Sequence, residues 1–91
     1  MEAKLAISDD ISNQVIENAI NQISRNGFTT FHLIDELEKT EPELMEDIRS
    51  WSVRNWRSIV GKAIKRYSIE TSKITQVSPP NETPARWKKV P

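Results

Sequence analysis

The chain has 91 residues, of which 36% are hydrophobic and 29% charged, so we expect one small domain with a modest core. Thirteen basic and thirteen acidic residues leave no net charge. The absence of cysteine excludes disulfides and thiolate metal sites, and no stretch approaches the ~18 apolar residues of a transmembrane helix.

The two halves of the chain carry opposite charge. Residues 1–47 contain three basic and eleven acidic side chains, a net charge of −8. Residues 48–91 contain ten basic and two acidic ones, a net charge of +8. Such asymmetry indicates an anionic partner for the second half. The alternative is that the two halves neutralise each other within the fold.

The first predicted element is an amphipathic helix that Ser8 or Asp9 can cap. Asn26 and Gly27 end it, with Gly27 suited to a left-handed cap. The apolar positions recur at helical spacing and fall on one half of the helix: Ile11, Val15, Ile16, Ala19, Ile20 and Ile23. This helix is therefore expected to have one buried face and one hydrated face.

A short second helix is predicted after Phe28, which we expect to enter the core as an extended residue. Thr29 or Thr30 caps this helix, and it ends at residues 38–40. Its apolar stripe is Leu33, Ile34 and Leu37. His32, the only histidine, is expected at the surface of this helix.

The segment that follows is ambiguous between a short helix and a loop. Thr40 with Glu43 resembles a capping box, and Pro42 is tolerated in a first helical turn. We prefer the helix, with Leu44, Met45 and Ile48 facing inward.

The third main helix is predicted over residues 52–68, "SVRNWRSIVGKAIKRYS", with Ser52 as its cap. Its apolar face is assigned to the core: Val53, Trp56, Val60, Ala63, Ile64 and Tyr67. Its opposite face is polar and basic: Arg54, Asn55, Ser58, Gly61, Lys62 and Lys65. Gly61 inside a helix indicates close approach of another helix or of a DNA backbone, and a packing reason is preferred.

The rest of the chain predicts a β-hairpin. Residues 69–77 are rich in β-branched side chains, residues 78–84 form a proline-rich tip, and residues 85–90 return as a second strand. Trp87 is expected to anchor the hairpin on the first helix. The alternative is an exposed stacking platform.

This order of elements resembles the winged helix-turn-helix superfamily over residues 8–90. The resemblance rests on "GFTTFHLIDEL" as the strand that leads into the second helix, and on "SVRNWRSIVGKAIKRYS" in the position of the recognition helix. It implies an α+β fold with three main helices and a C-terminal β-hairpin, the wing. Residues 1–91 would form a single domain, with residues 1–7 flexible and residues 78–84 as the wing tip.

The resemblance also implies binding of double-stranded DNA, as a small transcriptional regulator or an accessory replication factor. The third helix would enter the major groove, where Arg54, Asn55 and Ser58 would face base edges. Phosphates would be contacted by Arg57, Lys62 and Lys65 on the helix and by Arg86, Lys88 and Lys89 on the wing. Neutralising ~4–6 phosphates predicts a log–log salt slope of about −4 to −5.

Two alternatives stay open. One is a winged-helix module that binds only a protein; the other is a nucleic-acid binder without sequence preference, including an RNA binder. The acidic N-terminal half is a candidate surface for a protein partner or for a second copy of the chain. No signal peptide is recognisable, so we expect a cytoplasmic or nucleoid-associated protein that does not bind membranes.

Residues with catalytic or metal-binding chemistry are sparse. His32 and Asp35 could be drawn into a triad with a serine, but nothing in their spacing supports one. One histidine and no cysteine make a metal site unpromising, and two glycines cannot build a phosphate-binding loop. We therefore expect no catalysis, no metal and no cofactor.

Overall fold

The computed structural model describes residues 11–79 and 82–91, which form four helices and three strands in an α+β arrangement. In chain order these are α1 (Asn13–Asn21), β1 (Gly27–Thr29), α2 (Thr30–Thr40), α3 (Pro42–Trp51), α4 (Trp56–Thr71), β2 (Ile74–Gln76) and β3 (Arg86–Lys89). The α+β class is confirmed, and the number of helices exceeds the three main ones expected. Ser8, Asp9 and the predicted flexible residues 1–7 lie outside the described part of the chain.

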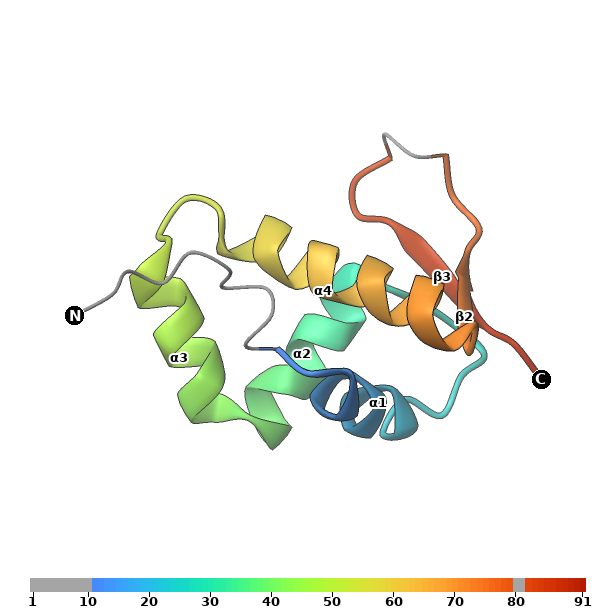
Figure 1. Cartoon of the computed structure of the whole chain (residues 1–91), viewed down its shortest axis with the longest axis horizontal. Helices are drawn as coiled ribbons and strands as arrows, with labels where there is room; N and C mark the ends of the chain where they lie inside the picture. Colours follow the sequence, from blue (N-terminus) through green and yellow to red (C-terminus); the bar gives the residue numbers. More distant parts are fainter. Residues whose placement is uncertain (1–10, 80–81) are drawn as a thin grey trace.

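One hydrophobic core joins the helices to the sheet. Most of its side chains come from α1, α2, α4 and the inner face of the sheet, while α3 adds Met45 and Ile48. Helix α3 lies at the end of the molecule away from the sheet (Figure 1). None of the described helices is both long and apolar enough to cross a membrane.

Helix α1 begins later and ends earlier than its apolar pattern suggests. Ser12 is the N-cap, and its hydroxyl oxygen accepts a hydrogen bond from the Val15 N–H at 3.2 Å. Gly27 does not cap the helix: it is the first residue of β1, and no described glycine has a positive φ. The expected left-handed cap is wrong because Gln22 stays right-handed and its N–H bonds to the carbonyls of Ala19 and Ile20.

Helix α2 begins with a capping box. The Thr29 hydroxyl accepts from the His32 N–H at 3.2 Å, while the Thr29 N–H donates to His32 Nδ1 at 3.0 Å. The predicted cap at Thr29 is confirmed, and so is the burial of Phe28 just before it. His32 is half-buried, because its ring serves as the second half of the cap. The helix runs through Thr40, the last of the residues at which it was predicted to end.

Helix α3 confirms the preferred reading of the ambiguous segment, although its cap was misplaced. Thr40 is the last residue of α2, Glu41 precedes α3 without a side-chain capping bond, and Pro42 occupies the first turn. Ser52 ends α3, since its N–H donates to the Ile48 carbonyl, and so it does not cap the next helix.

Helix α4 is therefore shifted toward the C-terminus relative to the prediction. It starts at Trp56 and continues through Thr71. Val53, assigned to the buried face, lies in the turn before the helix and is 78% exposed. The buried face otherwise follows the prediction: Val60, Ala63, Ile64 and Tyr67. Trp56 is half-buried and packs against this core.

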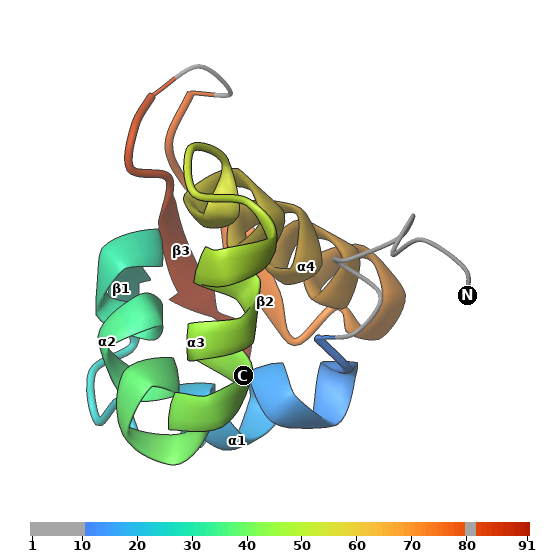
Figure 2. The ribbon, with the colours of Figure 1, turned by 90° about the vertical axis from the view of Figure 1, so that its left-hand side faces the viewer.

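The three strands form one antiparallel sheet in the order β1-β3-β2. The central strand β3 confirms the second predicted hairpin strand, whereas β2 covers only the end of residues 69–77. Ser72 is left-handed, with φ of 57°, and marks the point where α4 stops and the chain turns into β2. Both views place the β2–β3 connection and α4 on the upper side of the molecule and α1 on the lower side (Figures 1 and 2).

Trp87 of β3 anchors the sheet. It is 3% exposed and pairs with Phe28 of β1, and its indole N–H donates to the Thr30 hydroxyl at 3.1 Å. The alternative of an exposed stacking platform is wrong. The anchoring bond goes to the start of α2 rather than to the first helix as expected.

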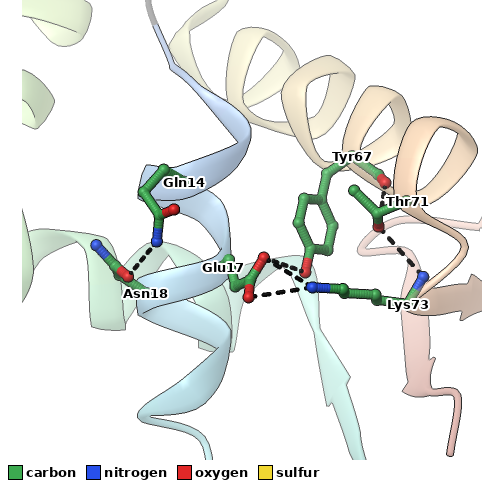
Figure 3. A network of polar contacts seen from close by, with 6 residues as sticks. All are labelled: Gln14, Glu17, Asn18, Tyr67, Thr71 and Lys73. Atoms are coloured by element: carbon green, nitrogen blue, oxygen red, sulfur yellow. Dashed lines mark hydrogen bonds and ion pairs between the residues drawn. The ribbon is translucent and has the colours of Figure 1, made fainter.

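A polar network joins α1 to the end of α4 (Figure 3). The Tyr67 hydroxyl donates to Glu17 at 3.4 Å, and Lys73 Nζ lies 3.2 Å from both oxygens of the same carboxylate. Thr71 donates to the Tyr67 carbonyl at 2.7 Å. Burial raises the pKa of the Tyr67 hydroxyl above its ordinary 10.0, and the negative charge of Glu17 raises it further.

The Trp87–Thr30 hydrogen bond can be tested with a double-mutant cycle. Thr30→Val should lower the free energy of unfolding by about 1–3 kcal/mol, because it leaves the buried indole N–H without an acceptor. In a Trp87→Phe background the same substitution should cost much less, since no donor remains. Urea denaturation of the four proteins measures the coupling, and additive costs would contradict a bond between these groups.

The raised pKa of Tyr67 predicts a pH dependence of stability. Above about pH 10 the unfolded chain releases this proton and the folded chain keeps it, so the free energy of unfolding falls as pH rises. The stabilising contribution is complete below that pH, and its loss cannot exceed about 1.4 kcal/mol per pH unit.

Tyr67→Phe should remove this part of the slope. Tyr67 is the only tyrosine, so absorbance of the tyrosinate in the native protein reports its ionisation directly. Urea denaturation between about pH 8 and about pH 11 compares the two proteins. Parallel curves would show that Tyr67 is not coupled to folding.

Candidate nucleic-acid interface

The outward face of α4 presents polar and basic residues on consecutive turns. Ser58, Lys62 and Lys65 are exposed, and Gly61 is half-exposed between them. Residues three and four apart lie on the same side of a helix, so these four share one face, opposite the buried Val60 and Ile64. The predicted separation of a core face from a basic face is confirmed for this part of the helix.

A groove of about 410 Å³ runs between this face and the β2–β3 connection. Helix α4 supplies Arg57 as well as the four residues of its outward face. The start of α2 supplies Thr30 and Phe31, and the connection supplies residues 82–85. The groove thus joins three segments that are distant in the sequence.

The cations of the groove form no ion pair with the acidic residues of the part of the first half that the structure describes, residues 11–47. Within residues 11–79 and 82–91, Lys62 and Lys65 take part in no ion pair. The Arg57 guanidinium lies over the Trp56 ring, 4.4 Å from its centroid. Arg57 also forms no ion pair with a carboxylate of the described residues.

Neutralisation between the halves does occur elsewhere. Arg49 pairs with Glu38, and Lys73 pairs with Glu17 at 3.2 Å. Each pair joins a basic residue of the second half to an acidic residue of the first. The alternative reading of the charge asymmetry is therefore correct for these two cations, whereas the acidic residues within 11–47 form no ion pair with the outward face of α4.

Arg54 and Asn55 are exposed, but they are not on the helix. Arg54 lies in the turn between α3 and α4, and Asn55 is the N-cap residue of α4, without a side-chain capping bond. Their predicted position on the helical face is wrong, because Ser52 ends α3 and three residues of turn follow. Of the three predicted base-reading residues, only Ser58 lies on α4.

The three predicted cations of the wing differ in their partners. Arg86 Nε donates to Glu82 at 2.7 Å, and Lys89 Nζ donates to the Ile23 carbonyl. Lys88 is exposed and forms no ion pair with any described residue. Because neighbouring residues of a strand point to opposite faces, Lys88 projects from the side of the sheet away from Trp87. None of the three lines the groove.

Sequence reasoning missed the second wall of the groove. Phe31 is 44% exposed at its rim, and Pro84 and Ala85 face it from the connection. The only signal for Phe31 was its position off the stripe of Leu33, Ile34 and Leu37. Nothing in the sequence indicated that the hairpin connection would lie beside α4.

No group of three acidic, histidine or cysteine side chains in the described ranges, 11–79 and 82–91, could hold a metal ion. The ring of His32 accepts a hydrogen bond from the Thr29 N–H through Nδ1, and its Nε2 lies 3.2 Å from Arg25 Nη2. Both ring nitrogens are therefore next to hydrogen-bond donors, and neither forms a hydrogen bond with a described serine. The arrangement on α4 can attract and hold an anion.

No protein-family model, no curated protein and no solved structure matches the chain. The function is therefore argued from the geometry of the groove and its charges.

Gly61→Ala should stabilise the protein. No atom lies within 4 Å of a Cβ built at Gly61, so a methyl group meets open space, and the packing reason preferred for this glycine is wrong. Alanine in a helix interior is favoured over glycine by about 0.5–1 kcal/mol. Thermal and urea denaturation measure the gain, and a loss of stability would show that the backbone here is more crowded than described.

Proposed function

We propose that the chain is a winged-helix domain that binds double-stranded DNA through α4 and the β2–β3 connection. The order of helices and strands, the sheet order β1-β3-β2 and the position of the connection beside α4 support this proposal. The observation that carries it is the pair of exposed cations Lys62 and Lys65, which form no ion pair with residues 11–79 or 82–91 and lie on a helix face without acidic residues. DNA phosphates are a polyanion that such a face attracts.

The positions of the polar and basic residues on and before α4 suggest which of them would contact bases and which would contact phosphates. Helix α4 is 16 residues long, and a major groove about 12 Å wide admits a helix of this kind. Ser58 would face the bases, and Arg54 and Asn55 would approach them from the turn before the helix. Arg57, Lys62 and Lys65 would bind phosphates on the helix side.

On the wing side, Lys88 would bind a phosphate directly, whereas Arg86 would have to share its guanidinium with Glu82. Lys89 is already bonded to the Ile23 carbonyl and would contribute least. The wing would therefore add less to affinity than the sequence suggests.

A second candidate is sequence-independent binding of nucleic acid. It is favoured by the location of Arg54 and Asn55, since two of the three expected base-reading side chains start from a turn. Selection from a random duplex library separates the two candidates. A recurring motif supports base readout, and an unenriched pool supports binding through phosphates alone.

Salt dependence tests the proposal directly. If Arg57, Lys62, Lys65 and Lys88 each neutralise one phosphate, the log–log plot of affinity for duplex DNA against salt should have a slope of about −4. Substituting Lys62→Ala and Lys65→Ala together should weaken binding and reduce the slope to about −2. Fluorescence anisotropy with labelled duplex, single-stranded DNA and RNA provides the measurement.

Lys39→Ala is the matched control. Lys39 is exposed on α2, and its one ion pair with residues 11–79 and 82–91 is a long contact of 3.8 Å with Glu36, so its loss removes one positive charge outside the groove. The slope should stay unchanged in this variant. A wild-type slope near zero, or equal losses in the control and the groove variants, would refute the proposal.

A further inference from the structure

The groove between α4 and the β2–β3 connection has an apolar side that phosphates would not use. Phe31, Pro84 and Ala85 line it, and Gly61 opposite them leaves open space where other residues would place a side chain. Its volume of about 410 Å³ lies within the range of sites that bind small molecules, about 300–1,000 Å³.

The other side of the groove is basic. Arg57, Lys62 and Lys65 line it, and the two lysines form no ion pair in the described part of the chain. The carboxylate among the lining residues, Glu82, is held by Arg86 through Nε at 2.7 Å and Nη2 at 3.4 Å. The site is therefore positively charged, and its own acid is already neutralised.

The neighbouring surface restricts what could fill the groove. A second hollow shares Phe31 and Arg57 with it but is also lined by Asp35 and Glu38. Glu38 is paired with Arg49, whereas Asp35 forms no ion pair with a described residue, so an acidic peptide long enough to cross both hollows would be repelled by Asp35. A small anion that stays within the groove avoids this carboxylate.

The wall formed by the connection is held in place without a ligand. The Thr30 N–H donates to the Ala85 carbonyl at 3.0 Å, and the Arg86 N–H donates to the Ser78 hydroxyl at 3.0 Å. The Glu82–Arg86 pair adds a third link. Pre-formed walls reduce the ordering that binding would otherwise require.

We infer that this groove binds a small organic anion with a flat apolar body, such as an aromatic carboxylate. The apolar body lies between Phe31, Pro84 and the backbone at Gly61, and the carboxylate faces Lys62 and Lys65. Occupancy competes with duplex DNA for these two lysines. The competition rests on the proposed function, whereas the binding does not.

Titration with 2-naphthoate, followed by the amide resonances of the ¹⁵N-labelled full chain, tests the site. Resonances of Phe31, Gly61 and Ala85 should shift together and saturate, with half-saturation on the order of 1 mM for a ligand of about a dozen non-hydrogen atoms. The neutral 2-naphthamide should bind at least about tenfold more weakly. Shifts scattered over the surface, or equal affinity for the amide, would overturn the inference.

Two variants separate the apolar and charged requirements. Gly61→Leu fills the groove, keeps every charge and improves helix propensity, so the variant should fold. Its affinity for 2-naphthoate, measured from the amide resonances, should fall at least about tenfold. Ser50→Leu, the same side chain at an exposed site of α3, should bind like the parent. Lys62→Gln with Lys65→Gln should lose binding to a similar extent. Unchanged binding in Gly61→Leu or in the lysine variant would overturn the assignment.

Competition is measured by adding 2-naphthoate to the protein–duplex complex. Release of DNA by 2-naphthoate, but not by the neutral 2-naphthamide at the same concentration, supports shared use of the lysines. If DNA binds and 2-naphthoate does not, the inference fails and the proposed function stands. If 2-naphthoate binds at the groove and no duplex binds, the ligand site stands and the proposed function fails. If the protein binds both 2-naphthoate and duplex DNA without competition between them, the inferred competition for Lys62 and Lys65 is overturned.

Discussion

Burial of Trp87 against the start of α2 is the contact on which the position of the β2–β3 connection depends. The indole occupies the inner face of the central strand, pairs with Phe28 and donates to the Thr30 hydroxyl. The preceding residue, Arg86, is the first of β3, and the carbonyl of Ala85, the last residue of the connection, accepts a hydrogen bond from the Thr30 N–H. These links hold the end of the connection beside α2 and across from the outward face of α4. Without them the groove would lack its second wall.

Charge is distributed over the fold in a way that leaves this groove positive. The ion pairs Arg49–Glu38 and Lys73–Glu17 use acidic residues of α1 and α2 to neutralise cations near the two ends of α4. Residues 50–68 contain no acidic side chain, so the middle of α4 has no local partner for Lys62 and Lys65. The net neutrality of the chain therefore coexists with a local concentration of positive charge on one side.

Hydrophobic periodicity was sufficient to locate the helices and the core. The spacing of the apolar residues defines the buried face of a helix, and this spacing is the same wherever the helix starts. It identified Ile16, Leu33 and Ile64 correctly, and the β-branched and proline-rich composition located the hairpin. It failed at the ends of elements, where Ser12 rather than Ser8 or Asp9 caps α1 and Ser52 closes α3 instead of opening α4. Serine has the same local chemistry at both positions, so only the tertiary packing distinguishes them.

The candidate site was predictable in part for a related reason. Lys62 and Lys65 follow from the helical period, whereas the partners of Arg86 and Lys89 depend on long-range geometry that no spacing encodes. The central place of β3 has a consequence for how the sheet forms. β1 and β2 do not pair with each other, so neither strand has a partner until residues 86–89 lie between them. Any condition that releases β3 therefore separates all three strands at once, and the sheet is lost as a unit.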